Sequence, residues 1–160
     1  MAKEAKTNAM RILDKKGIEY EVLRFECSDF TDGVSMAEAE GAPVDQTFKT
    51  IVTKGKSGAY HVLVIPVAEE IDLKAAAAAS DEKSLEMVHV KDLFGLTGYV
   101  RGGCSPIGMK KQFPTILDSS AEKFNEIYIS GGRIGLSLKM APADILAVTR
   151  GKYGDITRKG

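Results

Sequence analysis

The sequence predicts a domain of the mixed α and β class, in which helices surround a mixed, mostly antiparallel sheet. Its 160 residues match the size of one ordinary domain. Segments with a helical apolar pattern alternate with segments rich in β-branched and aromatic residues. Two pairs of expected strands are joined by short turns that contain glycine, and such hairpins outnumber possible βαβ units. We therefore expect residues 1–160 to fold as a single domain.

The N-terminal segment predicts a helix over residues 7–16, followed by a strand over 18–25. Thr7 can accept a hydrogen bond from the first helical turn, and Gly17 can adopt the left-handed conformation that ends a helix. The segment after Gly17 is rich in β-branched and aromatic residues, which is typical of a strand.

The next segment predicts a short helix and then a hairpin. Ser35 and Glu38 have the spacing of a capping box, so we expect a helix that begins there and ends at Gly41. Residues 48–54 and 59–66 are expected to be strands, and the four residues between them include two glycines. This spacing predicts an antiparallel pair.

The second half predicts a helix through the alanine run, capped by Asp72, and then a short strand over 85–88 and a helical turn over 90–96. Glycine and proline interrupt the remainder up to residue 118, which predicts strand and loop. The last expected elements are a short helix to 124 capped by Ser119 or Ser120, a hairpin over 127–140 that turns at Gly131 and Gly132, and a helix to 150 that begins at Pro142.

Composition excludes several classes of protein. Lys and Arg together number 22, as do Asp and Glu, so the chain does not grip nucleic acid through bulk positive charge. We expect no membrane span, because no apolar run approaches the roughly 20 residues required, and no signal peptide. Cys27 and Cys104 lie far apart, which indicates neither a disulfide framework nor a zinc site. We expect a cytoplasmic protein without a metal or other cofactor.

Few residues suggest nucleophile-and-base chemistry. His61 and His89 are best interpreted as structural or exposed residues, and no local signature joins Ser, His and Asp. The informative stretch is 102–108, where glycine amides can point at an anion or an oxyanion and Lys110 and Lys111 follow. The alternative for this stretch is a glycine-rich turn beside two solvated lysines.

Two further residues are candidates for a role in chemistry. Lys49 lies at the start of an expected strand, on the face that also carries Ile51, so its ammonium needs a partner, an exit to water or a ligand. Cys104 lies beside the glycine stretch, where a depressed pKa would make its thiol a nucleophile. The alternative for Cys104 is a small residue that lines a pocket.

The ordered motifs of this chain resemble the YbaK/EbsC family of aminoacyl-tRNA editing domains, and in particular its free-standing Cys-tRNA(Pro)/Cys-tRNA(Cys) deacylase branch. A single Gly-Gly-x-Ser-Pro segment would be a weak signal, but the matching pieces run in order along nearly the whole chain. They are residues 7–9, 48–50, 66–67, 72–74, 97–108, 110–111, 114–118 and 127–132.

The resemblance implies a single domain built on a curved, barrel-like sheet, with a pocket for the aminoacylated 3′ end of a tRNA. It maps the family's lysine onto Lys49 and the amides that polarise the ester carbonyl onto Gly102 and Gly103. The substrate-binding positions that it implies, or that adjoin them, are Phe25, Thr50, Cys104, Ser105, Ser130 and Ser137. The cations that we expect to contact tRNA are Arg101, Lys110 and Lys111.

The resemblance also implies a reaction that needs no protein nucleophile. In this branch the thiol of the substrate attacks its own carbonyl, which yields a thiolactone and free tRNA, and intramolecular attack can reach effective molarities on the order of 10⁵ M. Ser137 stands where that branch carries Asp, which bears on the preferred amino acid. Two alternatives remain open at this point: a deacylase for another small residue such as Ala-tRNA(Pro), or a non-catalytic module that binds a tRNA end. Prolyl-tRNA synthetase is the expected partner, and neither DNA nor a membrane is expected.

Overall fold

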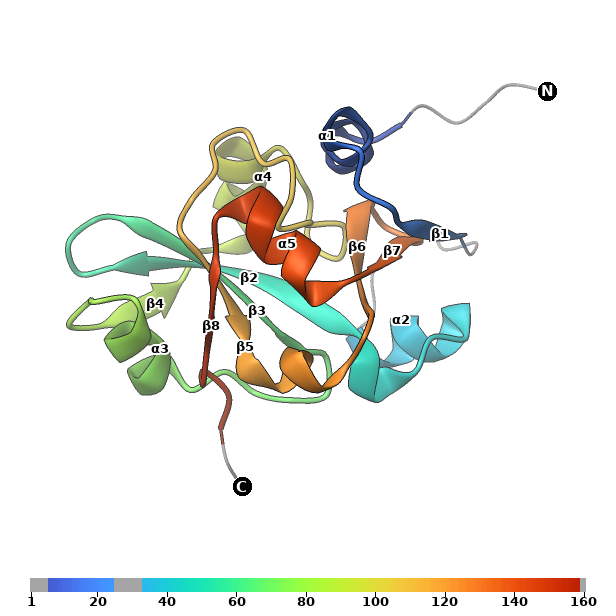
Figure 1. Cartoon of the computed structure of the whole chain (residues 1–160). Coiled ribbons are helices and arrows are strands. Elements are labelled where there is room, and N and C mark those ends of the chain that lie inside the picture. The colour runs from blue at the N-terminus through green and yellow to red at the C-terminus, as the bar shows by residue number, and fades with distance from the viewer. Residues whose placement is uncertain (1–5, 25–32, 159–160) are drawn as a thin grey trace.

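Two sheets form the framework of the computed structural model, which describes residues 6–24 and 33–158. The larger sheet has the strand order β4-β2-β3-β5-β8 and the smaller one β1-β7-β6 (Figure 1). The strands are β1 (Glu21–Arg24), β2 (Phe48–Gly55), β3 (Tyr60–Pro66), β4 (Leu85–Met87), β5 (Thr115–Asp118), β6 (Ile127–Arg133), β7 (Leu136–Met140) and β8 (Lys152–Gly154).

Short helices cover the sheets, and their ends follow local sequence signals. They are α1 (Asn8–Lys16), α2 (Gly33–Glu40), η1 (Val44–Gln46), α3 (Leu73–Ala79), α4 (Val90–Thr97), η2 (Ser119–Lys123) and α5 (Pro142–Thr149). Thr7 accepts a hydrogen bond from the Met10 amide at 3.3 Å, and Gly17 ends α1 in the left-handed conformation. Asp72 caps α3 through the Ala75 amide at 3.0 Å. These caps and the Pro142 start of α5 confirm the sequence prediction.

Antiparallel and parallel pairs coexist, as a mixed sheet requires. The β2–β3 hairpin pairs Phe48 with Pro66 at one end and Lys54 with Tyr60 at the other, which confirms the first predicted hairpin. Strand β5 pairs in parallel with both β3 and β8, and the sequence did not predict β8. The sheets meet at a parallel bridge between Thr47 and Tyr128, and they do not close into a barrel.

Two predicted helix starts are wrong. Ser35 lies inside α2, which begins at Gly33, so the capping-box pattern does not mark the start of that helix. The helix η2 is capped by Asp118 rather than by Ser119 or Ser120. The Asp118 carboxylate accepts hydrogen bonds from the Ser120 amide at 3.2 Å and from the Ile156 amide at 3.1 Å. It therefore ties the start of η2 to the C-terminal segment, a partner far away in sequence.

The turn of the second hairpin is also displaced from its predicted place. Gly131 and Gly132 lie within β6, at a register irregularity between Ser130 and Arg133, and the chain turns after β6, between Arg133 and Leu136. A Cβ atom on Gly131 would lie 2.9 Å from the Leu136 side chain. This glycine pair therefore allows close packing and a β-bulge within β6, and it does not form the turn.

The core is divided by the larger sheet. Val62 and Val64 of β3 belong to the main apolar cluster, together with residues of α1, β6 and β7, whereas Leu63 and Ile65 pack in a second cluster with α3. Because β3 is buried on both faces, its sequence is a nearly continuous apolar run. Among the described residues, no helix combines the length and the apolar character needed to cross a bilayer.

Candidate functional site

A cavity of about 360 Å³ opens where the two sheets diverge. Strand β4 pairs with residues 53–55 of β2, and β6 forms a bridge with Thr47, the residue before β2. The part of β2 between these two contacts forms one wall of the cavity. Helices α2 and α4, strands β6 and β7 and the glycine stretch supply the others. The lining includes Lys49, Thr50, Arg101, Gly102, Ser130 and Ser137. The volume suits a small organic ligand.

Lys49 contributes an ammonium group to this cavity from a half-buried position on β2. Burial lowers the pKa of Lys49 below its ordinary value, and the negative charge of Glu70 opposes that shift. Arg101 is the second cation of the lining, and the described lining residues include no histidine, aspartate or glutamate. The cavity therefore favours an anion, or an oxygen on which negative charge develops.

Hydroxyl groups line the cavity near Lys49. The Thr50 hydroxyl oxygen is buried and has no hydrogen-bond partner among the described residues. A buried hydroxyl without a partner lowers the stability of the fold unless a ligand supplies one. Ser130 and Ser137 face each other as register partners on β6 and β7. The Ser130 hydroxyl accepts a hydrogen bond from the Gly132 amide at 3.3 Å. The structure thus brings two adjacent predicted residues of β2, Lys49 and Thr50, into one cavity with Ser130 and Ser137 of the distant β6–β7 hairpin.

Only part of the glycine stretch reaches the cavity. Gly102 lines it with φ of 84°, a conformation that favours glycine. The Gly103 amide, expected to face an ester carbonyl, instead donates to the Val100 carbonyl at 3.0 Å, and a Cβ there would lie 2.9 Å from the Ile134 nitrogen. Ser105 is fully buried, and its hydroxyl accepts from the Ile107 amide at 3.2 Å. Gly103 and Ser105 therefore shape the loop and do not line the cavity.

Cys104 lines the cavity as a neutral thiol. Burial raises the pKa of Cys104 to about 12, although a hydrogen bond with the Thr97 side chain opposes the shift. The hypothesis of a depressed pKa is therefore wrong, because no cation compensates for the removal of this sulfur from water. Its alternative role, a small residue in the pocket wall, agrees with its 5% exposure.

The predicted tRNA-contacting cations spread outward from the cavity. Arg101 lines it, Lys111 is exposed, and the Lys110 ammonium stands over the Phe94 ring at 5.3 Å from the centroid.

Phe25 lies outside the described residues. The described residues include no cluster of three or more metal-ligating side chains. Sequence reasoning missed the walls contributed by α2 and α4, whose apolar residues carry no chemical signal of a site.

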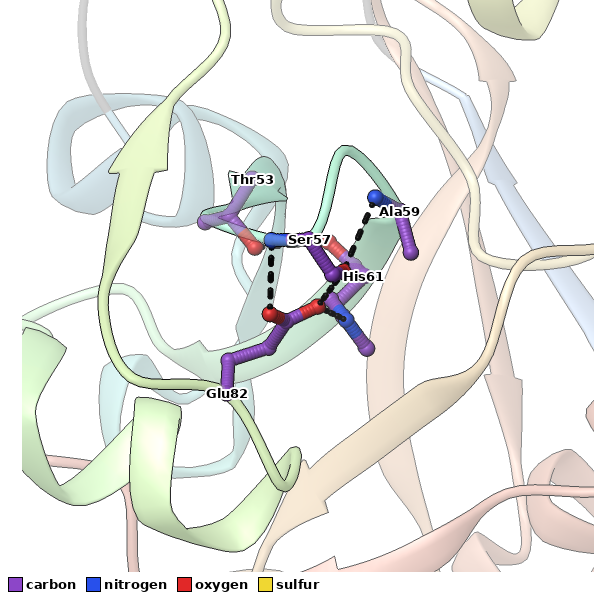
Figure 2. Close-up of polar contacts among 5 residues, drawn as sticks. All are labelled: Thr53, Ser57, Ala59, His61 and Glu82. Carbon is purple, nitrogen blue, oxygen red and sulfur yellow. Dashed lines mark hydrogen bonds and ion pairs between the residues drawn. The ribbon is translucent and has the colours of Figure 1, made fainter.

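His61 belongs to a separate polar cluster and is structural, as predicted. Figure 2 shows the Glu82 carboxylate between the His61 ring and Ser57, with His61 Nε2 at 2.8 Å and Ser57 Oγ at 2.6 Å. The Ser57 amide also donates to Glu82 at 3.2 Å. A Cβ on Gly55 would fall 2.1 Å from the same carboxylate. The cluster fastens the β2–β3 hairpin to the segment after α3. His89, at the start of α4, is exposed.

Replacing Glu82 with glutamine is expected to lower the melting temperature at pH 7. Hydrogen bonds from Ser57 and then from His61 hold the pKa of Glu82 below its ordinary value of 4.5. A carboxylate with a lowered pKa stabilises the folded state above about 4.5, and this contribution is lost as the pH falls through the lowered value. Thermal melts from pH 7 to pH 3 should therefore show the two proteins converging in acid. Glu86→Gln, at an exposed position of β4, is the matched control, and a constant Glu82→Gln deficit at every pH would contradict the argument.

Comparison with known proteins gives concordant matches. Residues 30–148 match the model of the aminoacyl-tRNA editing domain family. A protein of Enterococcus faecalis named "Putative Cys-tRNA(Pro)/Cys-tRNA(Cys) deacylase EbsC" is 45% identical over 157 residues, which cover 98% of this chain and 96% of that protein.

Two solved structures have the same fold. One is titled "Crystal structure of a putative trans-editing enzyme for prolyl tRNA synthetase"; it has a TM-score of 0.83 and 24% identity and covers 98% of this chain and 100% of its own. The other, a crystal structure of a hypothetical protein, has a TM-score of 0.84 and 18% identity over 95% of this chain and 100% of its own. At these identities the similarity shows a shared fold and nothing more.

Proposed function

Because the chain belongs to the family of aminoacyl-tRNA editing domains, we propose that it removes cysteine from mischarged Cys-tRNA(Pro), and also from Cys-tRNA(Cys), as a free-standing deacylase. The relative from Enterococcus faecalis carries this activity in its name. We treat residues 1–160 as one editing domain, with the aminoacylated 3′ end of the tRNA as its ligand. Its place of action is the cytoplasm, where tRNA is charged.

One observation carries the proposal. The cavity offers two cations and several hydroxyl groups, but its described lining residues include no histidine, aspartate or glutamate, and its cysteine is a neutral thiol. Such a site can hold an ester and stabilise an oxyanion, but it supplies neither a general base nor a nucleophile. The substrate must then supply the attacking group, and a cysteinyl ester carries one.

The reaction replaces the C–O bond of the ester with a C–S bond and moves one proton from sulfur to oxygen. The sulfur of the cysteinyl thiolate attacks the ester carbonyl carbon, the new C–S bond closes a thiolactone ring, and the C–O bond to the ribose breaks. The proton given up by the thiol ends on the released ribose oxygen. The ordinary pKa of a cysteine thiol is about 8.5, so a nearby cation that favours its thiolate would accelerate attack.

Each group at the site has a role in this scheme. The Lys49 ammonium stabilises the negative charge that develops on the carbonyl oxygen, in an environment where burial strengthens that interaction. Thr50 lines the cavity next to Lys49 in the chain, and we assign its buried hydroxyl, which has no partner among the described residues, to the wall that contacts the acyl or ribose end. Gly102 allows close approach of the ester, and Ser130 and Ser137 bound the amino-acid side. We assign Arg101, Lys110 and Lys111 to the RNA backbone.

Release of labelled amino acid from Cys-tRNA(Pro), Cys-tRNA(Cys) and Ala-tRNA(Pro) tests the proposal. The cysteinyl esters should be cleaved at least about 100-fold faster than the alanyl ester, since an ester without a thiol loses the intramolecular nucleophile. Mass spectrometry should detect a thiolactone or its hydrolysis product. Comparable rates for Ala-tRNA(Pro) would instead assign the chain to another small amino acid and require water or the ribose hydroxyl as nucleophile.

The partner can be tested in the same assay. We propose that prolyl-tRNA synthetase supplies most of the tRNA contacts, because a chain with zero net charge gains little from bulk electrostatic attraction to RNA. Adding that synthetase should therefore raise the deacylation rate at physiological salt. If no aminoacyl-tRNA is cleaved with or without it, a binding module without turnover becomes the better description.

A further inference from the structure

Large apolar side chains gather on one side of the cavity mouth. Across the described residues, the exposed large hydrophobic side chains are Met87, Val90, Phe94 and Val100, at 52%, 58%, 57% and 47% exposure. All four belong to β4, to α4 or to the turn that follows α4. An isolated exposed apolar residue needs no explanation, but four within this short segment form a patch.

The patch is continuous with the cavity. Met87 and Val90 line the cavity, and Phe94 lies four residues after Val90 on α4, which places the two side chains on the same face of the helix, one turn apart. The chain then passes through exposed Val100 to Arg101, which returns to the cavity wall. A ligand that leaves the cavity across α4 therefore meets Phe94 next.

Charge divides the two sides of α4. On the side of Phe94, the Lys110 ammonium stands 5.3 Å from the ring centroid, and the Lys110 amide is held by the Thr97 carbonyl at 2.9 Å. On the other side, Glu86, His89 and Asp92 line a separate hollow together with Lys54 and Met87, and neither Phe94 nor Lys110 lines it. The Phe94 ring is thus paired with one cation, Lys110, and the acidic residues Glu86 and Asp92 line a hollow that excludes it.

We propose that Phe94 is a stacking platform for the nucleotide that precedes the terminal aminoacylated adenosine, with Lys110 next to its phosphate. This inference rests on the proposed function, which places the terminal nucleoside and its acyl group in the cavity. An aromatic ring with adjacent cations is the arrangement by which proteins hold single-stranded nucleic acid, since every base has a face that can stack. Lysine is depleted at protein–protein interfaces, so the position of Lys110 over the Phe94 ring favours RNA as the ligand.

The test compares a complete substrate with one that lacks the stacked nucleotide. With Cys-tRNA(Pro), Phe94→Ala should raise KM about tenfold, within the range expected for one lost base stack, and change kcat little. With cysteinyl-adenosine, which ends before the proposed platform, Phe94→Ala and the natural protein should have equal kcat/KM. Phe94→Tyr should behave as the natural protein, whereas Phe94→Leu should resemble Phe94→Ala.

Lys110 has a matched control in the same chain. Lys123 stands over the Phe124 ring at 5.2 Å, and η2, to which Lys123 belongs, contributes nothing to the cavity lining. Lys110→Ala should raise KM for the tRNA and flatten its dependence on salt, while Lys123→Ala should leave both unchanged. Equal effects of the two substitutions would overturn the role of Lys110.

Several outcomes would overturn the platform itself. Equal KM for Phe94→Leu and the natural protein would mean an apolar contact rather than stacking, and a loss that appears only when the synthetase is present would mean a protein-docking surface. A defect of Phe94→Ala on cysteinyl-adenosine would mean a structural role.

If the natural protein cleaves no substrate, the proposed function fails separately. Equilibrium binding of uncharged tRNA with and without its penultimate nucleotide then still decides the inference, since Phe94→Ala should weaken only the former.

Discussion

Lys49→Ala lowers kcat for deacylation of Cys-tRNA(Pro) by about 10²- to 10³-fold, which is the cost of removing one preorganised group that stabilises an oxyanion. The cavity lining includes one other cation, Arg101, and no acid in its described part, so Lys49 carries much of the positive potential at its wall. Single-turnover release of labelled cysteine measures the effect on the chemical step. Lys54→Ala is the matched control, because Lys54 lies exposed on the same strand, near the Tyr60 ring.

The fold should survive this substitution. Burial lowers the pKa of Lys49, so its charged form is less favourable in the folded chain than in the unfolded one. Below the lowered pKa this lysine therefore opposes folding, and alanine removes the penalty at pH 7. The melting temperature of Lys49→Ala should equal or exceed that of the natural protein.

The pH dependence provides a second measurement. Activity that depends on the charged ammonium should fall as the pH rises through a value below the ordinary 10.5 of lysine. That descending limb should be absent from the residual activity of Lys49→Ala. A Lys49→Ala variant that is folded and as active as the natural protein would exclude the role proposed for Lys49.

Gly108→Ala is expected to destabilise the protein by about 2–5 kcal/mol, the largest effect on stability that we predict. Gly108 has φ of 81°, where an L side chain costs about 1–2 kcal/mol. Its Cβ would also lie 2.7 Å from the Tyr99 hydroxyl and 2.8 Å from the Ala9 nitrogen, and overpacking of this kind costs about 1–3 kcal/mol more. For a chain of this length the melting temperature should fall by about 10 °C.

A second glycine separates the two causes. Gly17 has φ of 71°, but nothing lies within 4 Å of its Cβ position, so Gly17→Ala carries the backbone cost alone. Calorimetry should therefore show a drop of about 3 °C for Gly17→Ala, well below that of Gly108→Ala. Equal drops would mean that the close approach to α1 is relieved by small shifts, and the packing explanation would then fail.

The sequence by itself predicted the elements whose signals are local. A cap such as Thr7 or Asp72 acts within one helical turn, and the β2–β3 hairpin is predicted by the short glycine-containing turn between its two strands. The set of motifs also identified Lys49, Thr50, Ser130 and Ser137, all of which the structure places in one cavity.

Tertiary structure decided what depends on partners distant in sequence. The glycine stretch was interpreted as a ligand cradle, yet Gly103 packs against the β6–β7 turn and Gly108 against α1, and Gly102 is the one glycine of this stretch that lines the cavity. Gly131 and Gly132 were expected to form a turn, but they lie within β6 at a β-bulge. Strand β8 is short and has no periodicity of its own, and it forms because β5 offers it an edge. The pKa of Cys104 likewise depends on burial rather than on neighbouring lysines, because desolvation is set by the assembled core and not by the residues beside it in the chain.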